Sequence, residues 1–334
     1  MTGALRDIRR RSAVRFSAEF VRLENTPACG GGGRSTPTTP TAAPTPNVPS
    51  TLRLVSGETG QPVAGASVTL AGQALRSDAQ GAVAVPAGPR RLRTLGRRVL
   101  DVVAPGFLDR QTLLREGGAE ISLWPRVTAS GVDENFTATL VYTSTGDGAT
   151  TGAATLIRHR PSTTSVTMVL SPDLFADPDS RAWHQLAADS LNVATNGKII
   201  HRVTSERPAS GVVIDVSYDP ANAGCSSSVR GFTSRRFTAG EITGATVVYC
   251  ASDAPRSGTV VHEMGHTFGV GHSPDPRDVM YFSVVRGRSE VYTPKEAFTL
   301  KMMTTRAPAT RYPDNDRETS GIAAFSGEDR IVCR

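Results

Sequence analysis

The stretch that most constrains this chain runs from residue 262 to residue 272 and reads His-Glu-Met-Gly-His-Thr-Phe-Gly-Val-Gly-His. His262 and His266 are four residues apart, which places both on one face of a helix, about one turn apart. Gly269 can end that helix in a left-handed turn without a Cβ penalty, so that the chain turns back and brings in His272. Three imidazole ligands with one open position are typical of a catalytic zinc ion. The spacing therefore predicts one Zn²⁺ ion.

Glu263 follows the first of these histidines directly. A carboxylate at that place can take a proton from the water that a metal ion activates. The pattern therefore predicts Glu263 as the general base of a hydrolytic reaction. The alternative is that the histidines are ordinary core or surface residues of a helix, but five fixed positions of mostly rare residue types match rarely by chance.

The eleven residues match the pattern HExxHxxGxxH and resemble the metzincin clan of zinc endopeptidases. The clan has a methionine turn beneath the metal, and Met280 lies eight residues after His272. This short spacing, with Ser273 directly after the third histidine, is most similar to the matrixin branch. The resemblance implies hydrolysis of a protein or peptide substrate. Core packing alone is the alternative role for Met280.

The resemblance has limits, because no PRCGxPD-like propeptide segment and no second zinc or calcium loop of the matrixins is recognisable in the sequence. A rival hypothesis is a catalytically silent zinc-binding surface or adhesion protein that works through its N-terminal β unit. The intact Glu263 argues against that hypothesis. A purely structural metal would need a closed set of four ligands, and no fourth ligand is evident near the motif.

Composition bounds the remaining classes. The chain has 334 residues, of which 38% are hydrophobic, enough for two modest domains and a linker. The net charge of +6 is scattered, without a basic stripe that alternates with aromatic residues, so nucleic-acid binding is not predicted. No apolar run reaches the roughly 18 residues of a membrane-spanning helix. We expect a monomer.

Residues 1–50 are expected to be a disordered segment and linker. The basic start lacks an uninterrupted apolar stretch, yet the Gly-rich run that begins at Cys29 resembles the end of a bacterial lipoprotein signal. The Thr-, Pro- and Gly-rich residues that follow predict an extended tether. The sequence thus indicates a secreted or cell-surface protein, with membrane anchoring only through Cys29. The alternative is a disordered tail with one free thiol.

Residues 51–125 carry short apolar stretches separated by turn residues, which predicts a small β-sandwich. The alternation of Leu52 and Leu54, the turn at 57–62, the strand at 63–70 and the turn at 78–81 set this pattern. The segment from Gly57 to Leu70 resembles carboxypeptidase regulatory-like domains.

Residues 126–334 are expected to form the catalytic domain, so that the whole chain is of the α+β class. The resemblance implies a mixed twisted sheet with two long helices. The sequence predicts helices at 178–196, from 254 through the motif, and from Pro294, where Thr293 is the cap. It predicts strands at 136–142, 165–170, 211–218 and 246–250, and a wrapped or mobile tail at 309–334.

The strand before the motif helix has a further implied role. By resemblance, it is an antiparallel edge strand on which the substrate pairs as an added strand. The residues concerned are Thr246, Val247, Val248 and Tyr249. Outside the motif, His159 is expected at the surface, and His184 and His201 are expected to be structural.

Four cysteines occur in the sequence. Cys225 and Cys250 flank the loop between two predicted strands, and in an exported protein a disulfide between them would stabilise that loop by about 3 kcal/mol. This pairing is favoured, because the segment around Cys333 looks loosely structured. Pairing of Cys333 with either of the other two stays open.

Overall fold

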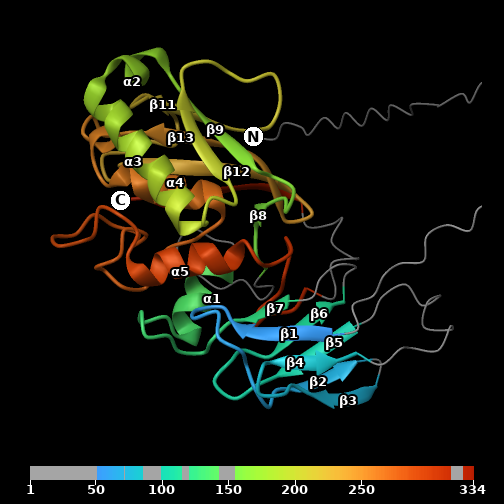
Figure 1. Cartoon of the computed structure of the whole chain (residues 1–334). Coiled ribbons are helices and arrows are strands. Elements are labelled where there is room, and N and C mark those ends of the chain that lie inside the picture. The colour runs from blue at the N-terminus through green and yellow to red at the C-terminus, as the bar shows by residue number, and fades with distance from the viewer. Residues whose placement is uncertain (1–50, 71, 86–98, 115–119, 143–154, 317–325) are drawn as a thin grey trace, which may run out of the picture. The chain divides into compact units, whose positions relative to one another are not determined.

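The computed structural model describes residues 51–70, 72–85, 99–114, 120–142, 155–316 and 326–334. The expected tether and Cys29 lie outside these residues. The described part is a mixed α/β structure with three sheets and few helices (Figure 1). None of its helices is long and apolar enough to cross a membrane.

The first strands form two small sheets with their own hydrophobic core, as the turn pattern predicts for a β unit. Alternate residues such as Leu52, Leu54 and Val68 point into this core. One sheet has the order β4–β1–β7 and the other the order β3–β2–β5–β6. The domain boundary that the sequence predicts at residue 125 stays a prediction. The strands are β1 (Thr51–Ser56), β2 (Ser67–Leu70), β3 (Gln73–Arg76), β4 (Ala82–Ala84), β5 (Val99–Val103), β6 (Arg110–Leu113) and β7 (Glu120–Leu123).

A larger sheet carries the order β10–β9–β11–β13–β12–β14, and β8 pairs with the start of β13. The neighbours from β10 to β13 are parallel, whereas β12 is antiparallel to β13 and to β14. The strands are β8 (Arg158–His159), β9 (Ser165–Leu170), β10 (Ile200–Thr204), β11 (Val212–Tyr218), β12 (Gly231–Thr238), β13 (Glu241–Tyr249) and β14 (Gly327–Cys333).

The expectation that residues 246–249 form a sheet edge is wrong. These residues lie in β13, which pairs in parallel with β11 on one side and antiparallel with β12 on the other. The run of β-branched residues in β13 is typical of a strand buried on both faces, which fits an interior position. The antiparallel partner of β13 is β12.

The described helices are α1 (Glu134–Tyr142), α2 (Pro172–Ala176), α3 (Pro178–Ala194), α4 (Thr259–Phe268) and α5 (Pro294–Met303). The sequence pattern correctly predicts α3, whose N-terminal cap is Asp177. It also predicts the start of α5, where Thr293 and Glu296 form a capping box.

Residues 136–142 are a helix, although the sequence predicts a strand. Phe136, Leu140 and Val141 are buried at helical spacing, and the Asp133 carboxylate accepts a hydrogen bond from the Phe136 N–H at 2.7 Å. This cap and the burial of one face together outweigh the β propensity of the threonines and aromatic residues in the segment.

The sequence predicts a wrapped or mobile tail at 309–334, but its last residues form a strand, because β14 pairs with β12 from Gly327 to Cys333. Ile331 and Cys333 are buried in this strand. The structure joins Cys225 and Cys250 in the favoured disulfide, and Cys333 is a buried free thiol.

A buried charge network joins β6 to the segment after α5. Arg306 donates to both carboxylate oxygens of Asp314, at 2.6 and 2.7 Å, and Arg110 of β6 donates to the same carboxylate at 2.8 Å. Arg110 also donates to Asp316 at 3.4 Å. Asp314 is fully buried. The two guanidinium groups compensate its charge, which would otherwise be costly in the interior.

Candidate metal centre

The helix α4 carries the first two motif histidines on a rigid element. It begins at Thr259, five residues later than the sequence predicts, because Ala254–Arg256 form a separate 3₁₀ turn. All residues of α4 are buried. Val260, Val261, Met264 and Phe268 pack into the main core. The core packing of this apolar face fixes the position of His262 and His266.

Gly269 ends α4 and allows the chain to turn back. Its φ is 122°, and a Cβ atom at this position would lie 2.0 Å from the carbonyl oxygen of Ile157. The returning chain is held by α1, because the Gly271 N–H donates to the Leu140 carbonyl at 2.7 Å. The return brings His272 to the other two histidines, as the motif predicts.

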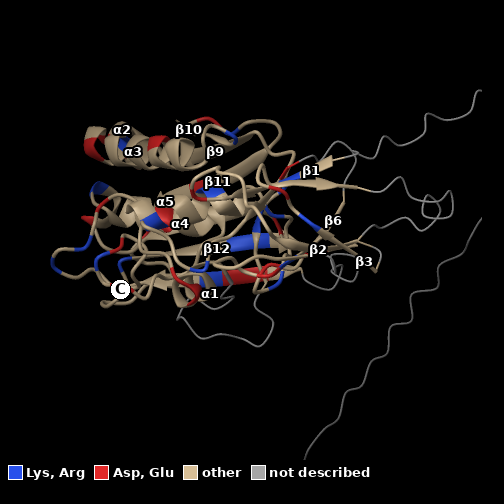
Figure 2. Ribbon diagram, turned by 60° about the horizontal axis from the view of Figure 1, so that its bottom comes forward, with Lys and Arg blue, Asp and Glu red and all other residues tan. Residues whose placement is uncertain are grey.

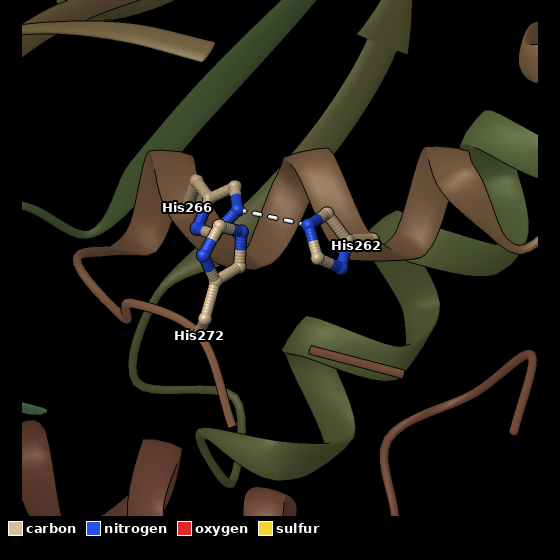
Figure 3. A group of neighbouring side chains, drawn as sticks. All are labelled: His262, His266 and His272. Carbon is tan, nitrogen blue, oxygen red and sulfur yellow. Dashed lines mark hydrogen bonds between the residues drawn. The ribbon is translucent and has the colours of Figure 1, made fainter. Parts of the chain in front are cut away.

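The three histidines meet in one place (Figure 3), and one ring nitrogen from each lies within 4.8 Å of the others. All three are buried. Burial lowers the pKa of His262 and of His266 well below the ordinary value, so both are neutral.

The hydrogen bonds of His262 and His266 fix their tautomers. The Nδ1–H of His262 donates to the Val279 carbonyl at 2.7 Å, and the Nδ1–H of His266 donates to the Val270 carbonyl at 2.9 Å. Since a neutral imidazole has one proton, both Nε2 atoms carry lone pairs. These two atoms face each other at 3.0 Å, the contact drawn as a dashed line in Figure 3. Two lone pairs at this distance repel, and a bound cation removes the repulsion. The donor set therefore fits a metal ion.

Glu263 is fully buried beside this group. One carboxylate oxygen, Oε2, accepts a hydrogen bond of 2.6 Å from the Thr233 hydroxyl of β12, and Oε1 has no hydrogen-bond partner among the described residues. Burial raises the pKa of Glu263 to about 8, while the Thr233 hydrogen bond and the charge of Arg288 lower it. A nearby divalent cation would further favour the ionised carboxylate.

Met280 lies against the same helix. A Cβ atom on Gly265, between the two helical histidines, would lie 2.4 Å from the Met280 sulfur. The turn around Met280 is held by the Ser273 N–H, which donates to the Met280 carbonyl at 2.8 Å, and by the Met280 N–H, which donates to Glu296 at 2.8 Å. Met280 thus packs beneath the turn of α4 that carries the histidines.

Three further residues lie near the site, and no sequence pattern predicts them there. Thr233 and Arg288 both act on the Glu263 carboxylate, as described above. The third is Cys333, whose sulfur lies within 4.8 Å of a His262 ring nitrogen and a Glu263 oxygen. Burial raises the pKa of this thiol to about 12. Only the strand pairing of β12 and β14, which is long-range, brings Thr233 and Cys333 here.

Thr233→Val is expected to lower kcat by roughly 10- to 100-fold with little change in KM, because one charge-assisted hydrogen bond that holds Glu263 is lost. Steady-state kinetics on a peptide substrate measures both constants. Thr233→Ser keeps the hydroxyl and should restore most of the rate. Equal losses in the valine and serine variants would show that Thr233 acts through packing and not through its hydroxyl.

Two histidines lie buried behind α4 rather than in the metal group. His159 is only 1% exposed, so the expected surface position is wrong. His201, which is expected to be structural, is buried as well. Both rings contact Phe268, with ring centres 5.8 and 6.1 Å away. Burial lowers the pKa of His159 from 6.5 to about 3 and that of His201 from 6.5 to about 4.

Acid is expected to destabilise the metal-free protein through His159. The pKa of His159 is lower in the folded state than in the unfolded state. The stability that its neutral ring contributes is therefore complete above pH 6.5 and falls as the pH drops toward 3. The loss is about 1.4 kcal/mol per pH unit, or about 2 kcal/mol between pH 6.5 and 5. Urea unfolding of the wild type and of His159→Gln in chelator measures it. An identical pH slope in the two proteins would contradict the assignment.

Comparison with known proteins gives little. No family model matches the chain, and no curated protein matches it. Among solved structures it is similar to metalloproteinase-II from Bacteroides fragilis, with 11% identity, 76% of this chain and 84% of that chain covered, and a TM-score of 0.31. A TM-score this low carries no argument, so the geometry of the site has to support any function.

Proposed function

We propose that this protein is a zinc-dependent endopeptidase of the metzincin type, similar to matrixins. The proposal is carried by two observations. The Nε2 atoms of His262 and His266 lie 3.0 Å apart, each with a lone pair, and the buried Glu263 carboxylate beside them has one oxygen without a partner in the described part of the chain. A cation site with an adjacent carboxylate base is what metal-assisted hydrolysis requires.

In this mechanism His262, His266 and His272 hold the metal ion through ring nitrogens. When bound, a zinc ion supplies the Lewis acidity that polarises a carbonyl and lowers the pKa of water. Glu263 takes the proton of the attacking water at Oε1, while Thr233 holds Oε2, and it then gives the proton to the leaving amine. Met280 supports the turn of α4 beneath the ligands, without bonding the metal.

The choice of a protein or peptide as substrate rests on the motif, and the proposed location rests on the disulfide. Cys225 and Cys250 are joined, and disulfides persist mainly in oxidising compartments. We therefore propose that the protein acts outside the cytoplasm, either secreted or attached to a membrane through Cys29.

The test is metal content and proteolysis measured on one preparation. Mass spectrometry is expected to find one zinc ion per chain, and unfolded casein is expected to be cleaved. Dialysis against a chelator should abolish cleavage, and added Zn²⁺ should restore it. Zinc bound without cleavage by any form of the protein would overturn the peptidase and favour a structural metal.

A further inference from the structure

The loop from residue 281 to residue 293, between the Met280 turn and α5, carries two arginines. It projects at the far left of Figure 1, and Figure 2 shows much of it in blue. A β-turn folds the loop back, because the Arg288 N–H donates to the Val285 carbonyl at 3.2 Å and Gly287, the third residue of the turn, has a φ of 84°. This turn leaves Arg286 exposed at the tip of the loop, whereas Arg288 is half-buried.

One contact of Arg288 leads toward the third metal ligand. Its guanidinium donates through Nη1 to the Tyr281 carbonyl at 3.4 Å. Tyr281 in turn forms a parallel β-bridge with Ser273, the residue that follows His272. The guanidinium is therefore tied to the backbone segment that runs beside His272.

A second contact of Arg288 lies on the side of the general base. Burial raises the pKa of the Cys333 thiol, whereas the charge of Arg288 and a side-chain hydrogen bond from it lower this pKa. The Cys333 sulfur lies within 4.8 Å of a His262 ring nitrogen and of a Glu263 oxygen. The charge of Arg288 also acts on the Glu263 carboxylate. Arg288 therefore lies beside the place at which a peptide bond would be attacked.

The positive charge of Arg288 lacks an ion-pair partner. No carboxylate forms an ion pair with it in the part of the chain that the structure describes. Two neighbouring arginines differ in this respect, because Arg277 pairs with Asp275 at 2.9 Å and Arg235 pairs with Asp329. The thiol and the carbonyl that Arg288 contacts satisfy some of its donors but do not neutralise its charge. A half-buried guanidinium in this state is complementary to a carboxylate, which it can bind through two parallel hydrogen bonds.

We propose that Arg288 is a specificity-determining residue that binds an acidic side chain of the substrate next to the peptide bond that is cleaved. This inference rests on the proposed peptidase function. A substrate with aspartate or glutamate at that place brings its carboxylate to the guanidinium, whereas glutamine leaves the charge unpaired. Because hydrogen bonds to charged groups are among the strong ones, the expected preference for glutamate over glutamine is about 10-fold or more.

Peptide binding tests the inference without cleavage. The ligands are alanine-based heptapeptides, acetylated and amidated, with glutamate or glutamine at the centre, and the protein is zinc-loaded Glu263→Gln. Calorimetric titration is expected to show about 10-fold or more tighter binding of the glutamate peptide. Arg288→Met in the same background should remove this preference, and Arg286→Met, which removes the same charge from the loop tip, should keep it. Equal affinities in the parent, no binding of either peptide, or a preference that persists in Arg288→Met would overturn the inference.

A third peptide separates the two sources of a carboxylate. It carries glutamine at the centre and a free carboxyl terminus in place of the amide. This peptide is expected to bind as weakly as the amidated glutamine peptide. Binding as tight as that of the glutamate peptide, and lost in Arg288→Met, would mean that Arg288 recognises the end of a chain, which would overturn the assignment to an acidic side chain.

Cleavage of dephosphorylated casein separates this inference from the proposed function. Mass spectrometry of the wild-type products is expected to find aspartate and glutamate enriched beside the cleaved bonds, and Arg288→Met should cleave without this enrichment. An equal loss of rate at all sites in Arg288→Met, with the enrichment retained, would show that Arg288 acts on Glu263, which would overturn the specificity role and leave the peptidase standing. Preferential binding of the glutamate peptide through Arg288, with no cleavage by any of the proteins, would support Arg288 and overturn the peptidase.

Discussion

Glu263→Gln is expected to keep its zinc and to lose about 10³-fold or more in kcat. Glutamine has nearly the same shape and can still accept the Thr233 hydrogen bond, so the helix and the three histidines should be undisturbed. It cannot take up a proton, however, and the attacking water loses its base.

The matched control for this experiment is Glu290→Gln, which removes an exposed carboxylate from the loop that follows Met280. Its rate should stay within about twofold of the parent, since the net charge changes equally in both variants. Zinc content by mass spectrometry must be one per chain in all three proteins. If Glu263→Gln cleaves casein at the parent's rate with its zinc in place, Glu263 is not the base.

Gly269→Ala is expected to lower the free energy of unfolding by about 3 to 5 kcal/mol. Two effects add. The φ of 122° is strained for any residue with a Cβ, and that Cβ would lie 2.0 Å from the Ile157 carbonyl oxygen, which is backbone and cannot rotate away. The return of the chain toward His272 would be displaced, so zinc affinity should fall as well.

Gly287→Ala isolates the conformational part of this cost. Gly287 also has a positive φ, of 84°, but a Cβ there meets no atom within 4 Å. Urea unfolding should show a loss of roughly 1 kcal/mol for this variant. Equal losses at the two glycines would mean that the Ile157 contact has no part in the effect.

The metal group was predictable because it is local in sequence. Helical spacing and a glycine stop bring His262, His266 and His272 together within eleven residues. Thr233 lies 30 residues before Glu263, and only the position of β12 makes it a neighbour. Cys333 and β14 were missed for the same reason, since nothing in a polar tail shows which strand edge it will cover.

The errors in the fold have specific causes. The α1 segment carries β-branched and aromatic residues, whose strand propensity is overridden by the Asp133 cap and by burial of one helical face. His159 has an arginine on each side, which suggested an exposed position. Arg158, however, is itself buried and donates to the carbonyls of Met303 and Arg306 at 2.7 Å. Tertiary contacts satisfy that charge in a way the local sequence does not reveal.

The network of Arg110, Arg306 and Asp314 has a consequence for how the protein denatures. Arg110 comes from β6, whereas Arg306 and Asp314 come from the segment after α5. The helix α5 in turn contacts the metal-bearing part, because the Glu296 carboxylate near its start holds the Met280 turn. If the N-terminal sheets separated alone, Asp314 would lose one of its two cationic partners in the interior. The two small sheets and the metal-bearing part are therefore thermodynamically coupled, and heating should produce one cooperative transition instead of two independent ones.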